Sequence, residues 1–69
     1  MRGPVTPSER VEAALREQLA GMASGDALPS IREIAAEHGV ANATVVRALA
    51  RLRTAGLITS RPGWGTFKA

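Results

Sequence analysis

The chain has 69 residues, no cysteine, one histidine and a formal net charge of +3 at pH 7. A chain of this length can bury one small core, so we expect no second, ligand-holding domain within it, and without cysteine neither a disulfide nor a thiolate metal site can add stability. The sequence also lacks a metal-ligand cluster and a glycine-rich phosphate loop, which argues against an enzyme and against a cofactor or metal.

The N-terminal end shows no sign of a membrane-directed segment. Met1–Pro4 leads into a charged stretch, and no apolar run approaches the length that spans a membrane. We therefore expect a cytoplasmic, nucleoid-associated protein with no membrane partner, in which residues 1–5 form a flexible tail and residues 6–69 form one domain.

Charge is distributed unevenly along the chain. Residues 1–37 contain four arginines and six carboxylates, a balance of −2, whereas residues 38–69 contain four arginines, one lysine and no carboxylate, a balance of +5. Five cations without a carboxylate repel one another unless a polyanion or counterions neutralise them. The C-terminal half is therefore a candidate phosphate-binding surface, with a solvated basic face as the alternative.

The first helix is predicted to begin at Thr6. Thr6 can cap the helix, Pro7 suits its first position and Glu9 completes a capping box. Apolar residues then recur at spacings of three and four, which is typical of a helix with one buried stripe. They are Val11, Ala14, Leu15, Leu19 and Met22. Gly21 and Gly25 are expected to end the helix.

A second, short helix is predicted after Pro29, where Ser30 and Glu33 repeat the capping-box pattern. Its apolar face consists of Ile31, Ile34 and Ala35. Gly39 is expected to end it, because glycine readily takes the left-handed conformation needed there.

A third helix follows almost at once, after an inward-pointing Val40, and is predicted to begin at Ala41 or Asn42. Gly56 is expected to end it, with Leu57 placed for a closing apolar contact. Its buried stripe is predicted to consist of Val45, Ala48, Leu49 and Leu52.

Beyond Gly56 the pattern changes from helix to strand. Residues 57–61 and 66–68 flank the turn residues Pro62-Gly63-Trp64-Gly65, which predicts a hairpin. The predicted fold class is mainly α with a small β-hairpin. Three helices followed by such a hairpin, or wing, is the order of a winged helix-turn-helix domain.

The second and third helices are separated by only a few residues around Gly39, as in a helix-turn-helix pair that places its second helix in the major groove. The face of the third helix opposite its buried stripe is therefore the candidate DNA surface. It carries Ala43 and Arg47, with Thr44 and Val46 on its flanks. Arg51 lies further along, at a place better suited to phosphate than to bases.

The hairpin offers a second candidate contact. Gly63 and Gly65 permit a tight tip, while Arg61 and Lys68 place cations at its base, so the tip is expected to approach the neighbouring minor groove or backbone. Trp64 has two main interpretations, packing over the first or third helix, or resting on the sugar-phosphate backbone, and intercalation is a third.

Several motifs stand in a specific combination along the chain. They are Leu28-Pro29-Ser30-Ile31-Arg32-Glu33-Ile34-Ala35, Gly39-Val40, Thr44-Val45, Ala48-Leu49, Leu52, Gly56-Leu57-Ile58 and Gly63-Trp64-Gly65-Thr66-Phe67. Together they resemble the DNA-binding domain of GntR-family regulators over about residues 11–68. The resemblance implies a bacterial transcription factor, usually a repressor, that binds a palindromic operator as a dimer and has a C-terminal effector-sensing domain. It also implies a base or phosphate contact for Arg32, and no small-molecule effector site is expected within these residues.

Several positions depart from the family pattern. Asn42 and Val46 stand where the family commonly has arginines, and Ala41 replaces a common serine cap, so that Asn42 is expected to cap the third helix one residue later. Asn42 can pair with adenine. Ala43, Thr44 and Val46 offer methyl contacts to thymine. These departures lead to the hypothesis of an operator richer in A·T than is usual for the family.

Double-stranded DNA is thus the predicted partner, bound at a palindromic or repeated operator, with a homodimer forming on the DNA. Two alternatives remain open. One is a winged-helix module that docks an acidic protein, and the other is an excisionase-like architectural binder that bends its DNA site.

Overall fold

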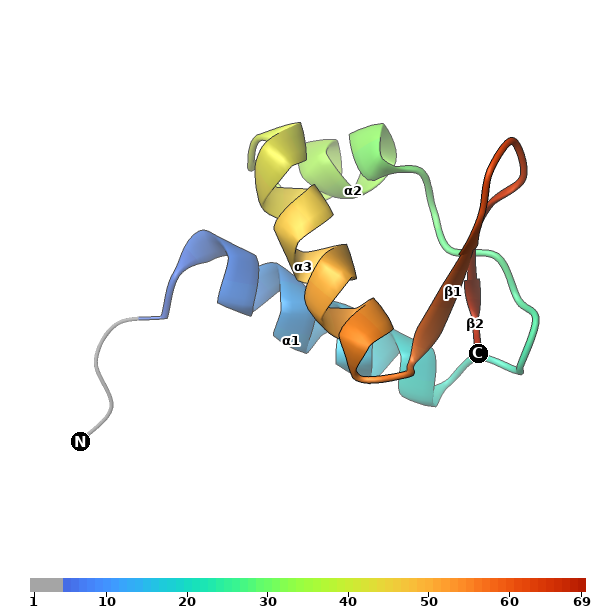
Figure 1. The fold of residues 1–69 in the computed structure, drawn as a ribbon. Helices are drawn as coiled ribbons and strands as arrows, with labels where there is room; N and C mark the ends of the chain where they lie inside the picture. The colour runs from blue at the N-terminus through green and yellow to red at the C-terminus, as the bar shows by residue number, and fades with distance from the viewer. Residues whose placement is uncertain (1–4) are drawn as a thin grey trace.

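The computed structural model describes residues 5–69, so the tail predicted over residues 1–5 lies outside the described residues except for Val5, which is exposed. Three helices precede a two-stranded antiparallel hairpin, and the predicted fold class is confirmed (Figure 1). The elements are α1 (Pro7–Ala20), α2 (Ile31–His38), α3 (Asn42–Thr54), β1 (Ile58–Arg61) and β2 (Gly65–Lys68). Among the described residues, no helix combines the length and apolar character that crossing a lipid bilayer requires.

The predicted start of α1 is confirmed at Thr6. Its side-chain oxygen accepts a hydrogen bond from the backbone N–H of Glu9 at 3.2 Å, and Pro7 occupies the first turn, where no intrahelical donor is needed. Within residues 5–69 the Glu9 side chain forms no bond in return to the Thr6 backbone, so the capping box predicted here is only half formed. Gly21 ends the helix as predicted.

The start of α2 has both halves of its capping box. Ser30 Oγ accepts from the Glu33 backbone at 3.1 Å, and Glu33 Oε1 accepts from the Ser30 backbone at 3.2 Å. Gly39 ends the helix in the left-handed conformation. Ile31, which was predicted to belong to the apolar face of this helix, is 38% exposed. Side chains tilt toward the N-terminus of their helix, so this first-turn residue projects beyond the core that covers Ile34.

α3 begins at Asn42, one of the two predicted starts, but its cap differs from the prediction. Ala41 is the N-cap, with an extended backbone and no side-chain hydrogen bond, and Asn42 is already the first helical residue. The expectation that Asn42 caps α3 is therefore wrong, because a capping side chain must belong to the non-helical residue before the first turn.

The end of α3 is a closed turn around Gly56. The backbone N–H of Leu57 donates to the Leu52 carbonyl at 3.0 Å and that of Gly56 donates to the Arg53 carbonyl at 2.9 Å. This pair of bonds is a Schellman motif, which needs a positive φ at its glycine, and Gly56 has φ 77°. Leu57 packs against the core, as predicted.

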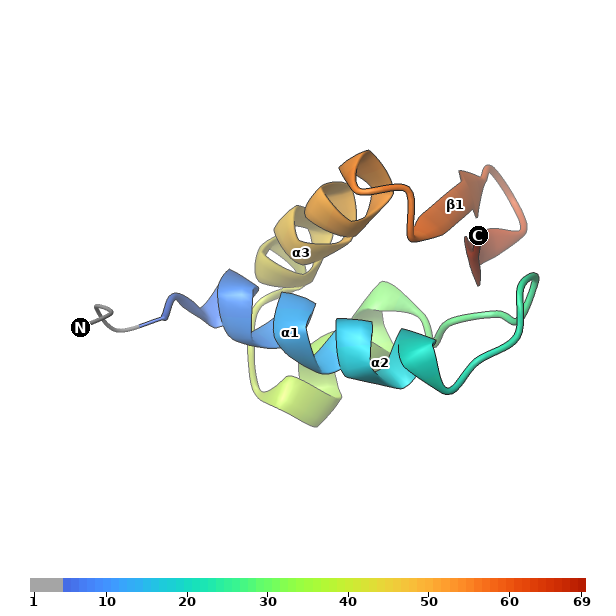
Figure 2. The same ribbon diagram turned by 90° about the horizontal axis from the view of Figure 1, so that it is seen from below.

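One small core joins the three helices and β1. Its buried residues come from the predicted stripes of α1 and α3, from the link before α2, from α2, and from the start of β1. They are Val11, Leu15, Leu19, Leu28, Ile34, Ala35, Val45, Ala48, Leu49, Leu52 and Ile58. α3 packs across α1 and leads directly into the hairpin at the far end of the molecule (Figures 1 and 2). The predicted stripe of α3 is buried in full.

The hairpin has a three-residue turn, and each strand differs by one residue from its predicted limit. The pairing runs from Ile58 opposite Lys68 to Arg61 opposite Gly65. The Trp64 N–H donates to the Arg61 carbonyl at 2.9 Å, and Gly63 has φ 79°, the positive value that a proline-glycine turn of this kind requires.

The link between α1 and α2 pairs with β2 through an isolated bridge at Ala27, which we call the third strand and which the sequence pattern does not predict. Ala27 bridges Phe67 in antiparallel fashion. The backbone N–H groups of Leu28 and Lys68 donate to the Thr66 and Asp26 carbonyls at 2.9 and 2.8 Å. This pairing attaches the hairpin to the segment that enters α2.

Candidate nucleic-acid interface

A groove separates the N-terminal ends of α2 and α3 from the hairpin turn, and we call it the wing groove. It is lined by Leu28, Pro29, Ser30, Ile31, Arg32, Asn42, Val46, Trp64, Gly65 and Thr66. Figure 1 shows the hairpin rising on the side of α2 where the link from α1 enters that helix, with the end of α3 leading into β1. Five of the predicted site residues, Arg32, Asn42, Val46, Trp64 and Gly65, are thus brought to one hollow from three separate elements.

The wing groove has an unusual apolar wall. Among residues 5–69, four large apolar side chains are exposed, and three of them line the groove: Ile31, Val46 at 49% and Trp64 at 81%. The expectation that Trp64 packs over α1 or α3 is wrong, because a side chain so exposed has little contact with either helix. Apolar groups gathered on a small surface mark an interaction site more often than scattered ones do.

Arg32 and Asn42 supply polar groups beside this wall, and no carboxylate of residues 5–69 lines the groove. Outside it, Ala43 and Arg47 are exposed on α3, while Thr44 is half-buried. Within residues 5–69, neither Arg32 nor Arg47 takes part in an ion pair. The N-terminal half of α3 therefore presents small side chains and an uncompensated cation.

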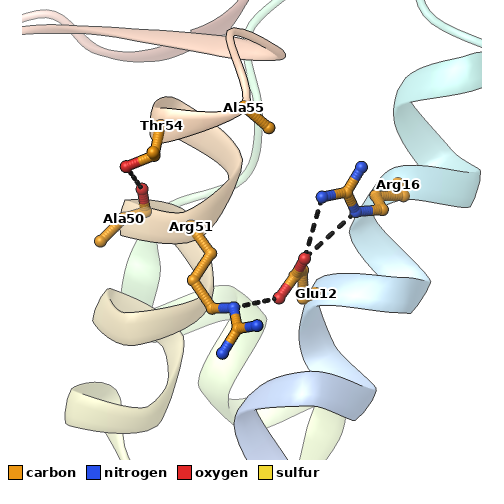
Figure 3. A pocket seen from close by; sticks show the side chains of 6 residues that line it. All are labelled: Glu12, Arg16, Ala50, Arg51, Thr54 and Ala55. Carbon is orange, nitrogen blue, oxygen red and sulfur yellow. Dashed lines mark hydrogen bonds and ion pairs between the residues drawn. The ribbon is translucent and has the colours of Figure 1, made fainter.

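Arg51 pairs with a carboxylate of α1, while 61% of its side chain stays exposed. Its Nε lies 2.8 Å from Glu12 Oε1, and Arg16 Nη2 lies 3.0 Å from Glu12 Oε2, so one carboxylate holds two guanidinium groups (Figure 3). Glu12 belongs to α1, and its side chain, which pairs with Arg51 of α3, is only 14% exposed. Sequence reasoning missed this carboxylate, although its spacing of four from Arg16 is a recognisable helical ion pair.

The two cations of the hairpin lie at opposite ends of its ladder, since Lys68 pairs with Ile58 at the base and Arg61 pairs with Gly65 beside the turn, so the expectation that both lie at the base is wrong for Arg61. Lys68 Nζ donates to the Leu19 carbonyl at 2.7 Å and to the Met22 carbonyl, and so satisfies acceptors at the C-terminal end of α1. Arg61 is exposed and lines a separate hollow with Thr59 and Phe67. Because Thr59 pairs with Phe67 and Arg61 pairs with Gly65, these side chains share one face of the hairpin. Neither cation lines the wing groove.

Gly63 lies in the exposed turn between the strands, as predicted. No group of His, Cys, Asp or Glu side chains in the described part of the chain is arranged to hold a metal ion. What the site offers is an exposed helix start, an apolar wall and unpaired cations, which suit the binding of a large anionic partner.

Comparison with known proteins places this arrangement in a family. Residues 7–67 match the model of the bacterial regulatory proteins of the gntR family. Over 62 residues the chain is 40% identical to YjiR, an uncharacterized HTH-type transcriptional regulator of Escherichia coli strain K12, and this match covers 90% of the chain but 12% of that protein.

Solved structures agree on the fold. PhnF from Mycobacterium smegmatis is 42% identical with a TM-score of 0.80, over 86% of this chain and 26% of that one. The DNA-binding domain of AraR, solved in complex with operator ORE1, is 25% identical with a TM-score of 0.91, over 100% of this chain and 94% of that one. The resemblance inferred from the sequence motifs is confirmed, and it is to regulators, not to enzymes. The chain belongs to the GntR family of bacterial regulatory proteins.

Proposed function

We propose that this chain binds double-stranded DNA at operator sites, as the DNA-reading part of a bacterial transcriptional regulator. The observation that carries the proposal is the grouping of Arg32, Asn42, Val46 and the hairpin turn around one groove at the exposed start of α3. The likeness to AraR(DBD), which was solved on its operator, supports the same assignment.

In this proposal the N-terminal half of α3 enters the major groove. That groove is about 12 Å wide and admits an α-helix. Ala43 and Ala50 are small and exposed, so they let the helix backbone approach the base edges closely, while Arg47 lies on the same outer face. Arg32, at the start of α2, is in position to contact a phosphate or base beside α3.

The hairpin is proposed to rest on the adjacent minor groove or backbone. Gly63 and Trp64 form an exposed turn, and Arg61 is exposed one residue before it. Because the third strand ties the hairpin to the body of the domain, the turn keeps its place relative to α3 when it meets DNA.

We further propose that two copies bind a palindromic or repeated operator and that occupancy represses transcription. One copy offers few unpaired cations on the proposed surface, so a single domain would make few phosphate contacts and bind weakly at physiological salt. A second copy on a neighbouring half-site doubles those contacts.

The test is salt-dependent binding to duplexes that the chain itself selects from a random pool. Fluorescence anisotropy across a series of salt concentrations should show log affinity falling linearly with log salt, with a slope of about −0.9 for each phosphate neutralised. Arg47→Ala should lower affinity and reduce the slope by about one. Arg16→Ala is the matched control, because it also removes an exposed arginine, but one that pairs with Glu12 on α1.

A flat salt dependence, or identical behaviour of Arg47→Ala and Arg16→Ala, would overturn the proposal. Either result would favour a winged-helix module that docks a protein. Strong binding with little sequence selection and a bent duplex would favour the architectural alternative.

A further inference from the structure

We propose that the apolar wall of the wing groove reads the 5-methyl group of thymine, with Val46 as the residue in contact. This inference rests on the proposed binding of duplex DNA and names the base chemistry that the site selects. Val46 is the one large apolar side chain exposed on α3 within residues 5–69, and it lines the groove together with Ile31 and Trp64.

The chemistry of the major groove leaves an exposed valine one specific partner. Base edges there present hydrogen-bond donors and acceptors, and the C5-methyl of thymine is the single large apolar group among them. A valine cannot pair with the polar edge of guanine, whereas burying it against a methyl group removes apolar surface of both partners from water. An apolar wall at the start of α3 therefore favours thymine.

The neighbour of Val46 one turn earlier strengthens the assignment. Asn42 is exposed, lines the same groove and is not used as a helix cap. An asparagine amide matches the N6 and N7 groups of adenine in the major groove. Residues four apart on one helix are separated by about 6 Å along its axis, so these side chains reach base pairs no more than about two steps apart. The site suits a short A·T element.

Charge supports duplex DNA as the occupant of the groove. Arg32 lines it, Arg47 lies on the next face of α3, and no carboxylate lines it. An apolar edge with phosphates on either side is what DNA presents at a run of thymines.

The test replaces single thymines by deoxyuridine in a duplex that the chain selects. Uracil keeps every hydrogen bond of thymine and lacks only the 5-methyl group. In each half-site, replacing one particular thymine by deoxyuridine should weaken the binding of the unaltered chain about fourfold. That factor corresponds to the free energy of burying one methyl group. Val46→Ala should bind both duplexes equally.

Val5→Ala is the matched control, because Val5 is 45% exposed and lies before α1, away from the groove. It should keep the full preference for thymine. Alanine is a better helix former than valine, so Val46→Ala should fold as well as the unaltered chain, which circular dichroism can check.

The outcomes separate the two proposals. If no selected duplex binds in a salt-dependent way, the proposed function fails and this inference fails with it. If duplexes bind but every thymine tolerates uracil, or if Val46→Ala keeps the whole penalty, DNA binding stands and methyl reading by Val46 is wrong. Selected sites dominated by guanine opposite α3 would likewise show that DNA binding stands and that methyl reading by Val46 is wrong.

Discussion

At the residue scale, the cations of the C-terminal half divide into two groups. Arg47, Arg53 and Arg61 are exposed, and none of them forms an ion pair within residues 5–69. Arg51 pairs with the Glu12 carboxylate but keeps 61% of its side chain exposed, whereas Lys68 donates to backbone carbonyls at the end of α1. The number of positive charges in this half is therefore larger than the number of cations without a partner in the protein.

Lys68→Met should lower the free energy of unfolding by about 1–2 kcal/mol, because the carbonyls at the end of α1 lose a charged donor while the apolar stem is kept. Arg61→Met, the control at the other end of the hairpin ladder, should leave stability nearly unchanged. Urea unfolding followed by circular dichroism measures both. A Lys68→Met variant of full stability with a shallower salt dependence of DNA binding would instead make Lys68 a phosphate contact.

At the scale of the element, the three helices differ in how their first turns are satisfied. α2 has a complete capping box, α1 has one side-chain bond from Thr6, and α3 has none. Ala41 stands at the cap of α3 with φ −72° and ψ 154°, a backbone that serine also adopts at N-caps. The start of the proposed recognition helix is thus the least stabilised helix start in the described chain.

Ala41→Ser should raise the free energy of unfolding by about 0.5–1 kcal/mol, because the new hydroxyl can accept from a first-turn N–H. For a domain of this size, 1 kcal/mol corresponds to about 4–8 °C in the thermal midpoint. Ala43→Ser makes the same chemical change inside α3 and should be neutral or slightly destabilising, since serine is a weaker helix former. Equal shifts for the two variants in thermal unfolding would contradict the cap argument.

At the scale of the whole molecule, one core and one backbone pairing hold the proposed DNA-binding parts together. α1 supports α3 through the core and through the Glu12–Arg51 ion pair. The link between α1 and α2 pairs with β2, so the hairpin is hydrogen-bonded on both sides of that strand. Both walls of the wing groove therefore belong to one packed unit.

This connection predicts a specific pattern of amide hydrogen exchange. The N–H groups of Gly25, Leu28 and Lys68, which bond across the junction between link and hairpin, should exchange as slowly as those of core helices. The N–H of Gly63, in the exposed turn, should exchange much faster. Residue-resolved exchange by NMR measures this. Fast exchange of the three junction amides would mean that the hairpin opens independently of the helices.

The sequence by itself determined the order of the elements, most of their ends and the core stripes of α1 and α3, because caps, glycine turns and helical periodicity depend on residues only a few positions apart. The sequence also identified the candidate site residues. Three features of the molecule depended on the tertiary structure: the exposure of Ile31 in the wing groove, the third strand at Ala27, and the bond of Lys68 to Leu19, which lies 49 positions away. Local patterns carry no information about partners so distant in the chain. Only the folded arrangement of helices and hairpin decided which cations remain available for DNA.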